Sequence, residues 1–323
     1  MRIGIPEALL FQRYEPIIRT FFNNLEVDVV YSGPSNQDIL ERGIRNCVDE
    51  ACLPMKLFQG HVSKLSEECD KVVVPRLMKC EFGDSICPKF SGLPELVGKG
   101  NYQSRFIFSD PLYLNDRAKL EQAVVKQGKQ LEVPKENIRR AFRAAEAAMN
   151  IRKAVYRAET DFADAAGMGE SEETKNPGER RKSRVALLGH PYNISDSFAN
   201  RNLINKLKRL EIEVITGEEM QEKDFNKQLT GLMKAPYWMF YRENFGKAGA
   251  LLESGSIDGI LYVSSFCCGT DSVIIEMIKS RIDDFPMLVL KIDEHTAEAG
   301  IDTRLEAFSE LLERRRYHEA HLS

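Results

Sequence analysis

The chain has 323 residues, 43% of them hydrophobic and 29% charged, with a formal net charge of −4. This length suits two domains with buried cores, and the slight acidity gives no reason to expect nucleic acid as a partner. No apolar run approaches the roughly 18 residues that span a bilayer, and the first residues lack the features of a signal peptide, so we expect a cytoplasmic protein without a membrane partner.

The first part of the chain predicts a Rossmann-like domain. Short apolar, β-branched runs alternate with helical segments, which is typical of a parallel sheet covered by helices. The expected strands are residues 2–6, 27–32, 71–77 and 104–110, and the expected helices are 16–25, 36–46 and 53–68.

A helical segment follows, and then a second domain of the same kind. Residues 134–166 contain helix formers with apolar residues at three-to-four spacing and predict a long amphipathic helix, whereas 167–183 are polar and predict an exposed connection. The expected later strands are 183–190, 213–216, 258–265 and 286–293, and the expected helices are 200–210, 237–254, 271–282 and 303–316.

The fold class is therefore α/β, with two Rossmann-like or flavodoxin-like domains that have parallel sheets and are joined by a helical segment. The predicted boundaries are 1–115 for the first domain, 116–180 for the helical segment with its polar linker, and 181–323 for the second domain.

Seven cysteines need an explanation other than disulfides, because the count is odd and disulfides are rare in a reducing compartment. Cys69, in a polar run, is interpreted as a small buried residue. Several of the others follow expected strands, where ligands of open parallel sheets bind. The residues that follow four strand ends are Lys79, Cys80 and Cys87; His190; Cys267 and Cys268; and Asp293, Glu294 and His295.

Two of the cysteines also stand at helix starts. Cys52 precedes Leu53-Pro54 and Cys268 precedes Gly269-Thr270, and the positive end of a helix stabilises a thiolate. Thiolates spread over distant loops favour an iron–sulfur cluster over zinc, since the chain has no CxxC knuckle. Plain buried cysteines remain an alternative, as does a nucleophilic cysteine oriented by a histidine, for which the candidates are His61, His190 and His295.

Neither a Walker-type phosphate loop nor a GxGxxG motif after the first strand occurs in the sequence. Seven segments, however, together resemble the 2-hydroxyacyl-CoA dehydratase component superfamily, nearest to its small proteins related to the dehydratase activases and more distantly to the double-cubane cluster proteins. The segments are GIPEALL, DEACLPMKLFQGHV, VPRL, ICPKFSGLPE, GHPYN, CCGTDS and DEHTAEAGIDTRLEAF.

The resemblance implies an oxygen-sensitive 4Fe-4S cluster between the two domains, bound by Cys52, Cys87 and Cys268. It also implies a partner, an ATP-dependent iron–sulfur activator protein that supplies low-potential electrons. The expected function is ATP-activator-dependent reductive chemistry on a small or acyl-CoA substrate. A sister dehydratase-like subunit or a homodimer is a further expected partner. The alternatives are an electron-transfer or cluster-carrier protein and a zinc-stabilised binding module.

Each of the three implied ligands has a second thiol close by in the sequence, namely Cys47, Cys80 or Cys267. Six thiolates would suit an 8Fe-9S double cubane, and the alternative is that these three are chance substitutions. Proton transfer by His190 and His295 is a further hypothesis beside a structural role, as is a role of Glu50 in tuning the cluster or holding an anionic substrate beside an ordinary salt bridge.

Overall fold

The structure is a computed structural model that describes residues 1–80, 83–98, 103–165, 182–217, 220, 222–234 and 236–322. Most of the connection predicted over 167–183 lies outside the described residues. The chain divides into two compact units. The N-terminal unit comprises residues 1–152 and 236–240, and the C-terminal unit comprises residues 153–235 and 241–323.

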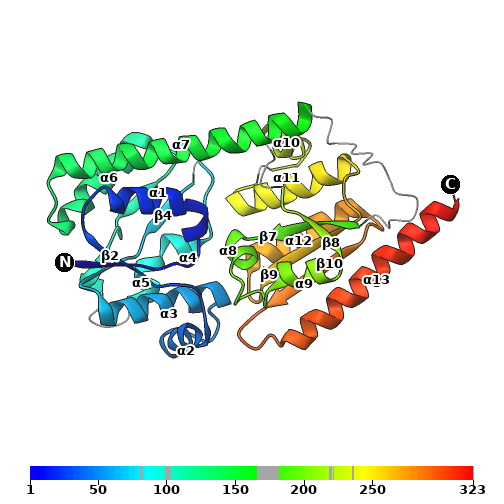
Figure 1. The fold of residues 1–323 in the computed structure, drawn as a ribbon, viewed down its shortest axis with the longest axis horizontal. Coiled ribbons are helices and arrows are strands. Elements are labelled where there is room, and N and C mark those ends of the chain that lie inside the picture. The colour runs from blue at the N-terminus through cyan, green and yellow to red at the C-terminus, as the bar shows by residue number, and fades with distance from the viewer. Residues whose placement is uncertain are drawn as a thin grey trace. The chain divides into compact units, whose positions relative to one another are not determined.

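The N-terminal unit is built on a four-stranded parallel sheet (Figure 1). Its strands, in the spatial order β2-β1-β3-β5, are β2 (Asp28–Tyr31), β1 (Arg2–Ile5), β3 (Lys71–Val73) and β5 (Phe106–Ile107). The helix α1 (Phe11–Asn23) joins the first two strands. Ile3, Ile5 and Ile107 are buried in the core, as the apolar runs of the sequence predict.

Two helices of this unit cross in backbone contact. They are α2 (Gln37–Asn46) and α3 (Leu53–Glu68). A Cβ on Gly43 would lie 1.9 Å from the carbonyl oxygen of Lys56, and one on Gly60 would lie 1.8 Å from that of Ile39. Only glycine permits so close an approach. The crossing fixes the short connection from Cys47, at the end of α2, to Cys52, at the start of α3.

The segment 71–77, expected to be one strand, is divided between two sheets. Pro75 cannot donate a hydrogen bond to a neighbouring strand, so the ladder of β3 ends before it. After the proline, β4 (Arg76–Lys79) pairs in parallel with β6 (Pro111–Tyr113) in a separate two-stranded sheet. The short elements that lie between these strands in the sequence are α4 (Pro88–Ser91), α5 (Leu93–Val97) and η1 (Gln103–Arg105).

The expected helical segment is confirmed. It consists of α6 (Arg117–Gly128), the 3-10 turn η2 (Lys129–Leu131) and α7 (Lys135–Ala165). Asp116 caps α6, because its side chain accepts a hydrogen bond from the amide of Lys119 at 3.0 Å. The long helix predicted over 134–166 agrees with α7 to within one residue at each end.

The C-terminal unit has a second four-stranded parallel sheet, in the order β10-β9-β7-β8. Its strands are β7 (Ser183–Gly189), β8 (Ile212–Ile215), β9 (Gly259–Ser265) and β10 (Met287–Ile292). The helices are α8 (Pro191–Ser195), α9 (Leu203–Arg209), α10 (Glu222–Lys227), α11 (Met239–Glu253), α12 (Gly269–Ile282) and α13 (Glu298–Leu322). Every residue of β9 is buried, and its side chains pack with those of α11 and α12 in the core. The predicted α/β fold class with parallel sheets is therefore confirmed.

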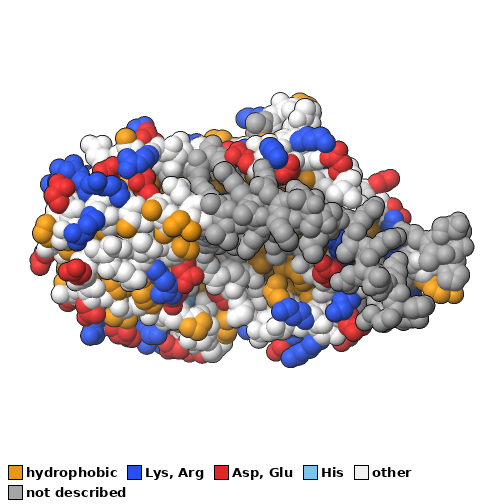
Figure 2. Space-filling model, turned by 45° about the horizontal axis from the view of Figure 1, so that its top comes forward, with side chains coloured by type: hydrophobic (Ala, Val, Ile, Leu, Met, Phe, Trp, Pro, Cys, Tyr) orange, Lys and Arg blue, Asp and Glu red, His pale blue; other side chains and the backbone are white. Residues whose placement is uncertain are grey.

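The surface carries charges of both signs. Figure 2 shows Lys and Arg side chains interspersed with Asp and Glu over the described part of one face. Among the described residues, no helix combines the length and the apolar character that crossing a membrane requires.

Candidate functional site

The strand ends of the C-terminal unit bring together a histidine and a cysteine. β7 and β9 are neighbours in the sheet, and His190 follows the first as Cys268 follows the second. Gly189 makes this geometry possible, since its φ is +143° and a Cβ there would lie 2.3 Å from the carbonyl oxygen of Val263. His190 thus leaves β7 close to β9, at the edge where ligands of such sheets bind.

Cys268 is the N-cap residue of α12. The residue before it, Cys267, has a left-handed backbone with φ +62°, which turns the chain from β9 into the helix. The Cys268 Sγ lies 3.2 Å from Thr270 Oγ1. The thiol is partly exposed and lies at the positive end of a helix of 14 residues.

A buried acid and a buried phenol support His190. The Tyr262 hydroxyl donates a hydrogen bond of 2.9 Å to Asp271 Oδ1, and the other oxygen of that carboxylate, Oδ2, lies 3.5 Å from His190 Nδ1. All three side chains are buried. The imidazole also stacks on Tyr192, with ring centroids 5.1 Å apart.

The electrostatic environment of the network follows from its burial. Burial alone disfavours a charged His190, but the negative charge of Asp271 and a hydrogen bond with Cys268 more than compensate and raise the pKa of the histidine. Burial, together with the charge of Asp271, raises the pKa of Tyr262 well above its usual value, so Tyr262 remains a hydrogen-bond donor. The site therefore combines a thiol, an imidazole and a carboxylate in one place.

Two amides hold the backbone around this site. Asn244 Oδ1 accepts a hydrogen bond of 3.0 Å from the amide of Gly189, and Asn193 Oδ1 accepts one of 2.8 Å from the Ser265 hydroxyl. Both asparagines are buried. The ends of β7 and β9 are thereby fixed by side chains as well as by the sheet.

The N-terminal unit brings the two other predicted ligand loops together. Cys52 and Cys87 are the N-cap residues of α3 and α4, each with a proline in the first turn of the helix. Lys89, two residues after Cys87, donates a hydrogen bond of 3.5 Å to Cys52 Sγ. The cluster predicted on Cys52, Cys87 and Cys268 takes ligands from both units, and it stays a prediction.

The four other cysteines differ in their environments. Cys80 is fully buried, Cys47 is half-buried with its thiol 3.8 Å from the carbonyl oxygen of Met55, and Cys267 is exposed. A second cubane on Cys47, Cys80 and Cys267 likewise stays a prediction. Cys69 is buried, and burial raises the pKa of its thiol to about 11, which fits the small buried residue expected there.

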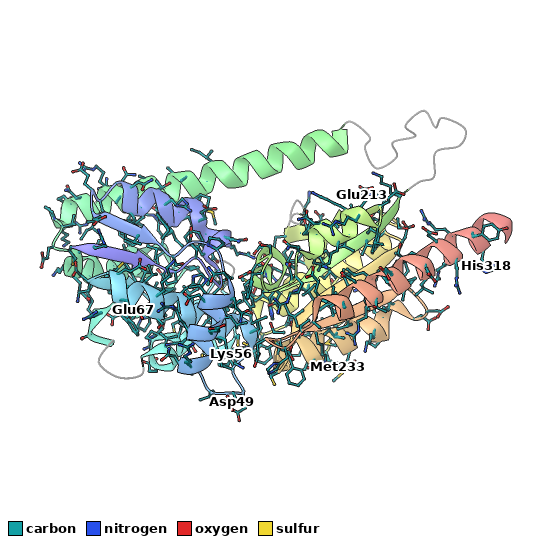
Figure 3. The ribbon with its side chains drawn as sticks, turned by 60° about the horizontal axis from the view of Figure 1, so that its bottom comes forward. Asp49, Lys56, Glu67, Glu213, Met233 and His318 are labelled. Carbon is teal, nitrogen blue, oxygen red and sulfur yellow. The ribbon has the colours of Figure 1, made fainter. Side chains whose placement is uncertain are left out.

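The charged neighbours of Cys52 and Cys87 have structural partners. Lys56, labelled with Asp49 in Figure 3, is buried and donates a hydrogen bond of 2.9 Å to the carbonyl oxygen of Asp49, whereas Glu50 is exposed. The Arg76 guanidinium donates hydrogen bonds of 2.8 Å to two carbonyl oxygens and pairs with Glu95. Lys56 and Arg76 hold the loops next to the cysteines in place.

Two other candidate histidines, His295 and His61, have different environments. The side chain of His295 is 86% exposed, and its Nε2 lies 3.9 Å from Glu294 Oε1. His61 is buried in α3, where its Nε2 shares a hydrogen bond of 3.0 Å with the Ser35 hydroxyl. Burial lowers the pKa of His61 to about 4, so this histidine is neutral and structural.

Sequence reasoning missed two members of the site. Asp271 was expected only as the first residue of a helix, and Tyr262 only as part of a strand. Both are buried and joined by a hydrogen bond. The available signals were an acid three residues after a helix-starting cysteine and one aromatic hydroxyl inside an apolar strand.

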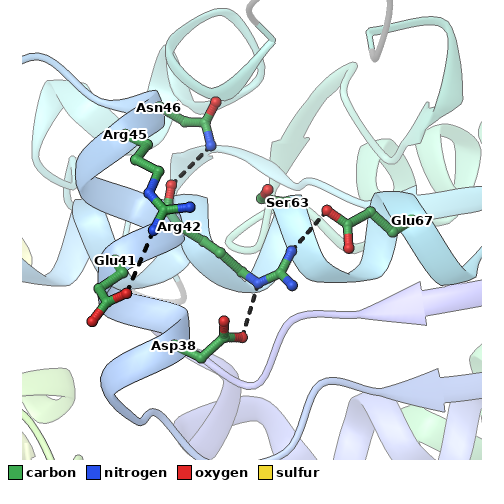
Figure 4. A pocket seen from close by; sticks show the side chains of 7 residues that line it. All are labelled: Asp38, Glu41, Arg42, Arg45, Asn46, Ser63 and Glu67. Carbon is green, nitrogen blue, oxygen red and sulfur yellow. Dashed lines mark hydrogen bonds and ion pairs between the residues drawn. The ribbon is translucent and has the colours of Figure 1, made fainter.

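A pocket in the N-terminal unit carries no comparable chemistry. It has a volume of about 290 Å³ and lies over α2 and α3 (Figure 4). Arg42 pairs there with Asp38 at 2.8 Å and with Glu67 at 2.7 Å, and Arg45 pairs with Glu41 at 3.5 Å. Three carboxylates face two guanidinium groups there, so these ion pairs leave a net charge of only −1 in the pocket.

The structure thus defines an α/β protein with two parallel-sheet units and a Cys–His–Asp site at the strand ends of the C-terminal unit. The chain belongs to the family described as CoA enzyme activase uncharacterised domain, whose model matches residues 2–220. His190 lies inside the matched range, whereas Cys268 and Asp271 lie beyond it. A comparison with curated proteins finds no match.

The family corrects the function expected from the sequence. The prediction of reductive, dehydratase-type chemistry, with its carrier and zinc-module alternatives, is wrong, because the match places the chain with the CoA enzyme activases. The cluster itself stays a prediction. The same match supports a dehydratase partner enzyme, in keeping with the expected dehydratase-like partner, whereas the ATP-dependent activator stays a prediction. The quoted segments encode strand ends and helix starts of the α/β fold, and such segments do not distinguish an activase domain from a dehydratase component.

Proposed function

We propose that this protein is an activating component that binds a CoA-dependent partner enzyme, a 2-hydroxyacyl-CoA dehydratase, on the surface around Cys268. Membership of the CoA enzyme activase family supports a partner enzyme of this kind. In this proposal the partner converts the acyl-CoA substrate, and both proteins work in the cytoplasm.

One observation supports this location for the partner-binding surface. Phe266 is 56% exposed and Val273 is 51% exposed, and these two apolar side chains stand on either side of Cys268 in the sequence. Phe266 begins the turn from β9 to α12, and Val273 lies in the second turn of α12. Exposed apolar side chains beside a polar functional site are typical of a surface that another protein covers.

The residues around Cys268 are also well supported. His190, Asp271 and Tyr262 are buried, and the ends of β7 and β9 are fixed by asparagine side chains. A surface that is already ordered loses little conformational entropy when it binds a partner. The combination favours binding through the Cys268 end of the C-terminal unit.

The test combines binding with activation. The purified chain is mixed under anaerobic conditions with a purified 2-hydroxyacyl-CoA dehydratase, and both the dissociation constant and the rate of substrate dehydration are measured. The wild-type chain is expected to bind and to raise the rate. Phe266→Ser should weaken binding about tenfold, since it removes about 1.4 kcal/mol of apolar burial.

Leu311 provides a matched control, because it is an apolar side chain of the same unit that is 50% exposed, on α13. Leu311→Ser should leave binding unchanged. The proposed surface is wrong if both serine variants bind equally well, and the proposed function is wrong if the wild-type chain neither binds nor activates the enzyme.

A further inference from the structure

The buried carboxylate of Asp271 is only half satisfied. The side chain is 0% exposed, and Tyr262 donates a hydrogen bond to its Oδ1. The other oxygen, Oδ2, accepts no hydrogen bond from any described residue. Burying a carboxylate in this way is costly unless a cation compensates it. The neighbour of Oδ2 that can carry a positive charge is His190, 3.5 Å away, and a metal ion bound by both side chains would satisfy the two groups together.

The distances fit a shared metal ion better than a hydrogen bond. His190 Nδ1 and Asp271 Oδ2 are 3.5 Å apart, which is longer than a normal hydrogen bond. Two ligand atoms at 2.0–2.1 Å from a tetrahedral zinc ion lie about 3.4 Å apart, by the geometry of the tetrahedron. One ligand atom each of His190, Cys268 and Asp271 lies within 4.8 Å of the other two. Small rotations of these side chains therefore bring all three to a common ion.

The surroundings resemble the outer shell of a metal site. Ligating carboxylates in proteins usually accept a hydrogen bond that orients them, and Tyr262 donates one to Asp271 here. The Thr270 hydroxyl lies 3.2 Å from the Cys268 thiol, at the N-terminus of α12. The ligands are thus held in place before any ion binds.

We propose that His190, Cys268 and Asp271 form a site for a single divalent transition-metal ion, Zn²⁺ or Fe²⁺, with one coordination position open. Thiolate, imidazole and carboxylate together suit these ions, and the two negative ligands balance the charge of the ion. Three protein ligands with an open fourth position are typical of catalytic rather than structural zinc sites. Cys268 is partly exposed, whereas His190 and Asp271 are buried, so the ion enters at the thiol.

A cubane cluster fits these three side chains less well. Each iron of a 4Fe-4S cluster has three sulfide ligands and takes one ligand from the protein. Three protein ligand atoms within 4.8 Å of one another instead converge on one atom. The proposed ion also needs ligands from the C-terminal unit alone. The inference does not depend on the partner enzyme.

The test is a Co²⁺ titration of the complete, tag-free chain after chelator treatment. Cobalt is a spectroscopic substitute for zinc or iron, and a cobalt–thiolate bond gives a characteristic charge-transfer band. The wild-type chain should bind one ion per chain with this band. Asp271→Asn preserves the shape of the side chain and should weaken binding at least tenfold, as should His190→Asn, while Cys268→Ser should abolish the band. Tyr262→Phe should weaken binding about tenfold.

Cys267→Ser is the matched control, because that thiol is adjacent but exposed. It should leave both the affinity and the band unchanged. Circular dichroism checks that each variant is folded. The inference is overturned if the wild-type chain binds no cobalt, or if Asp271→Asn and His190→Asn bind as tightly as the wild type. It is also overturned if anaerobically purified protein contains about four iron atoms and equal sulfide, lost in Cys268→Ser.

Discussion

Gly43 in α2 offers the sharpest test of how the N-terminal unit is packed. Gly43→Ala places a Cβ 1.9 Å from the carbonyl oxygen of Lys56, whereas ordinary van der Waals contact begins at 3.4 Å. The two helices must therefore separate by about 1.5 Å along this line. Overpacking of this kind costs about 3 kcal/mol, and alanine recovers about 1 kcal/mol through its better helix propensity. We expect a net loss of about 2 kcal/mol in the free energy of unfolding.

The assay is urea unfolding followed by circular dichroism. Gly300→Ala is the control, since Gly300 also lies in a helix, α13, and a Cβ there meets nothing within 4 Å. That substitution should leave the protein as stable as the wild type or stabilise it by up to about 1 kcal/mol. Equal urea midpoints for the two alanine variants would refute the backbone contact between α2 and α3.

Four further predictions follow from the same structure. The pKa of His61 is lowered to about 4 by burial, so the unfolded chain binds more protons between pH 6.5 and 4, and stability falls as the pH falls through this range. The loss between pH 7 and pH 5 is about 2 kcal/mol, and His61→Gln should remove most of it when urea midpoints are compared at these two pH values. Iodoacetamide at pH 8 should label the exposed Cys267 but not the buried Cys69, whose thiol has a pKa of about 11. Mass spectrometry of digests measures the labelling, and a labelled Cys69 would contradict the prediction. Phe266→Ser should weaken binding of the dehydratase, measured by calorimetry, whereas Leu311→Ser should not. Asp271→Asn should weaken cobalt binding at least tenfold without unfolding the chain.

Most of the fold could be predicted because the signals are local. Short apolar strands and longer amphipathic helices alternate, and this pattern defines parallel α/β units. The division of 71–77 into β3 and β4 was not predicted, although Pro75 marks the position where the ladder ends. A proline signals the interruption of a strand, but it does not tell which sheet receives the part that follows.

The site was predictable only in part, because a local sequence pattern does not reveal the order of strands in a sheet. The rule that ligands bind at strand ends placed His190 near Cys268, and the adjacency of β7 and β9 accounts for this. The same rule suggested His295, which follows β10 but projects into solvent. Asp271 and Tyr262 depend on a contact between a helix and a strand, which no spacing in the sequence reveals.

The left-handed turn at Cys267 places the two adjacent cysteines in different environments. Cys267 is exposed to solvent, whereas Cys268 begins α12 beside His190. A fluorophore attached to Cys267 would therefore sit one residue from the site without occupying it. The protein carries a natural attachment point for an optical probe, and changes in the emission of that probe would report events at Cys268 in real time.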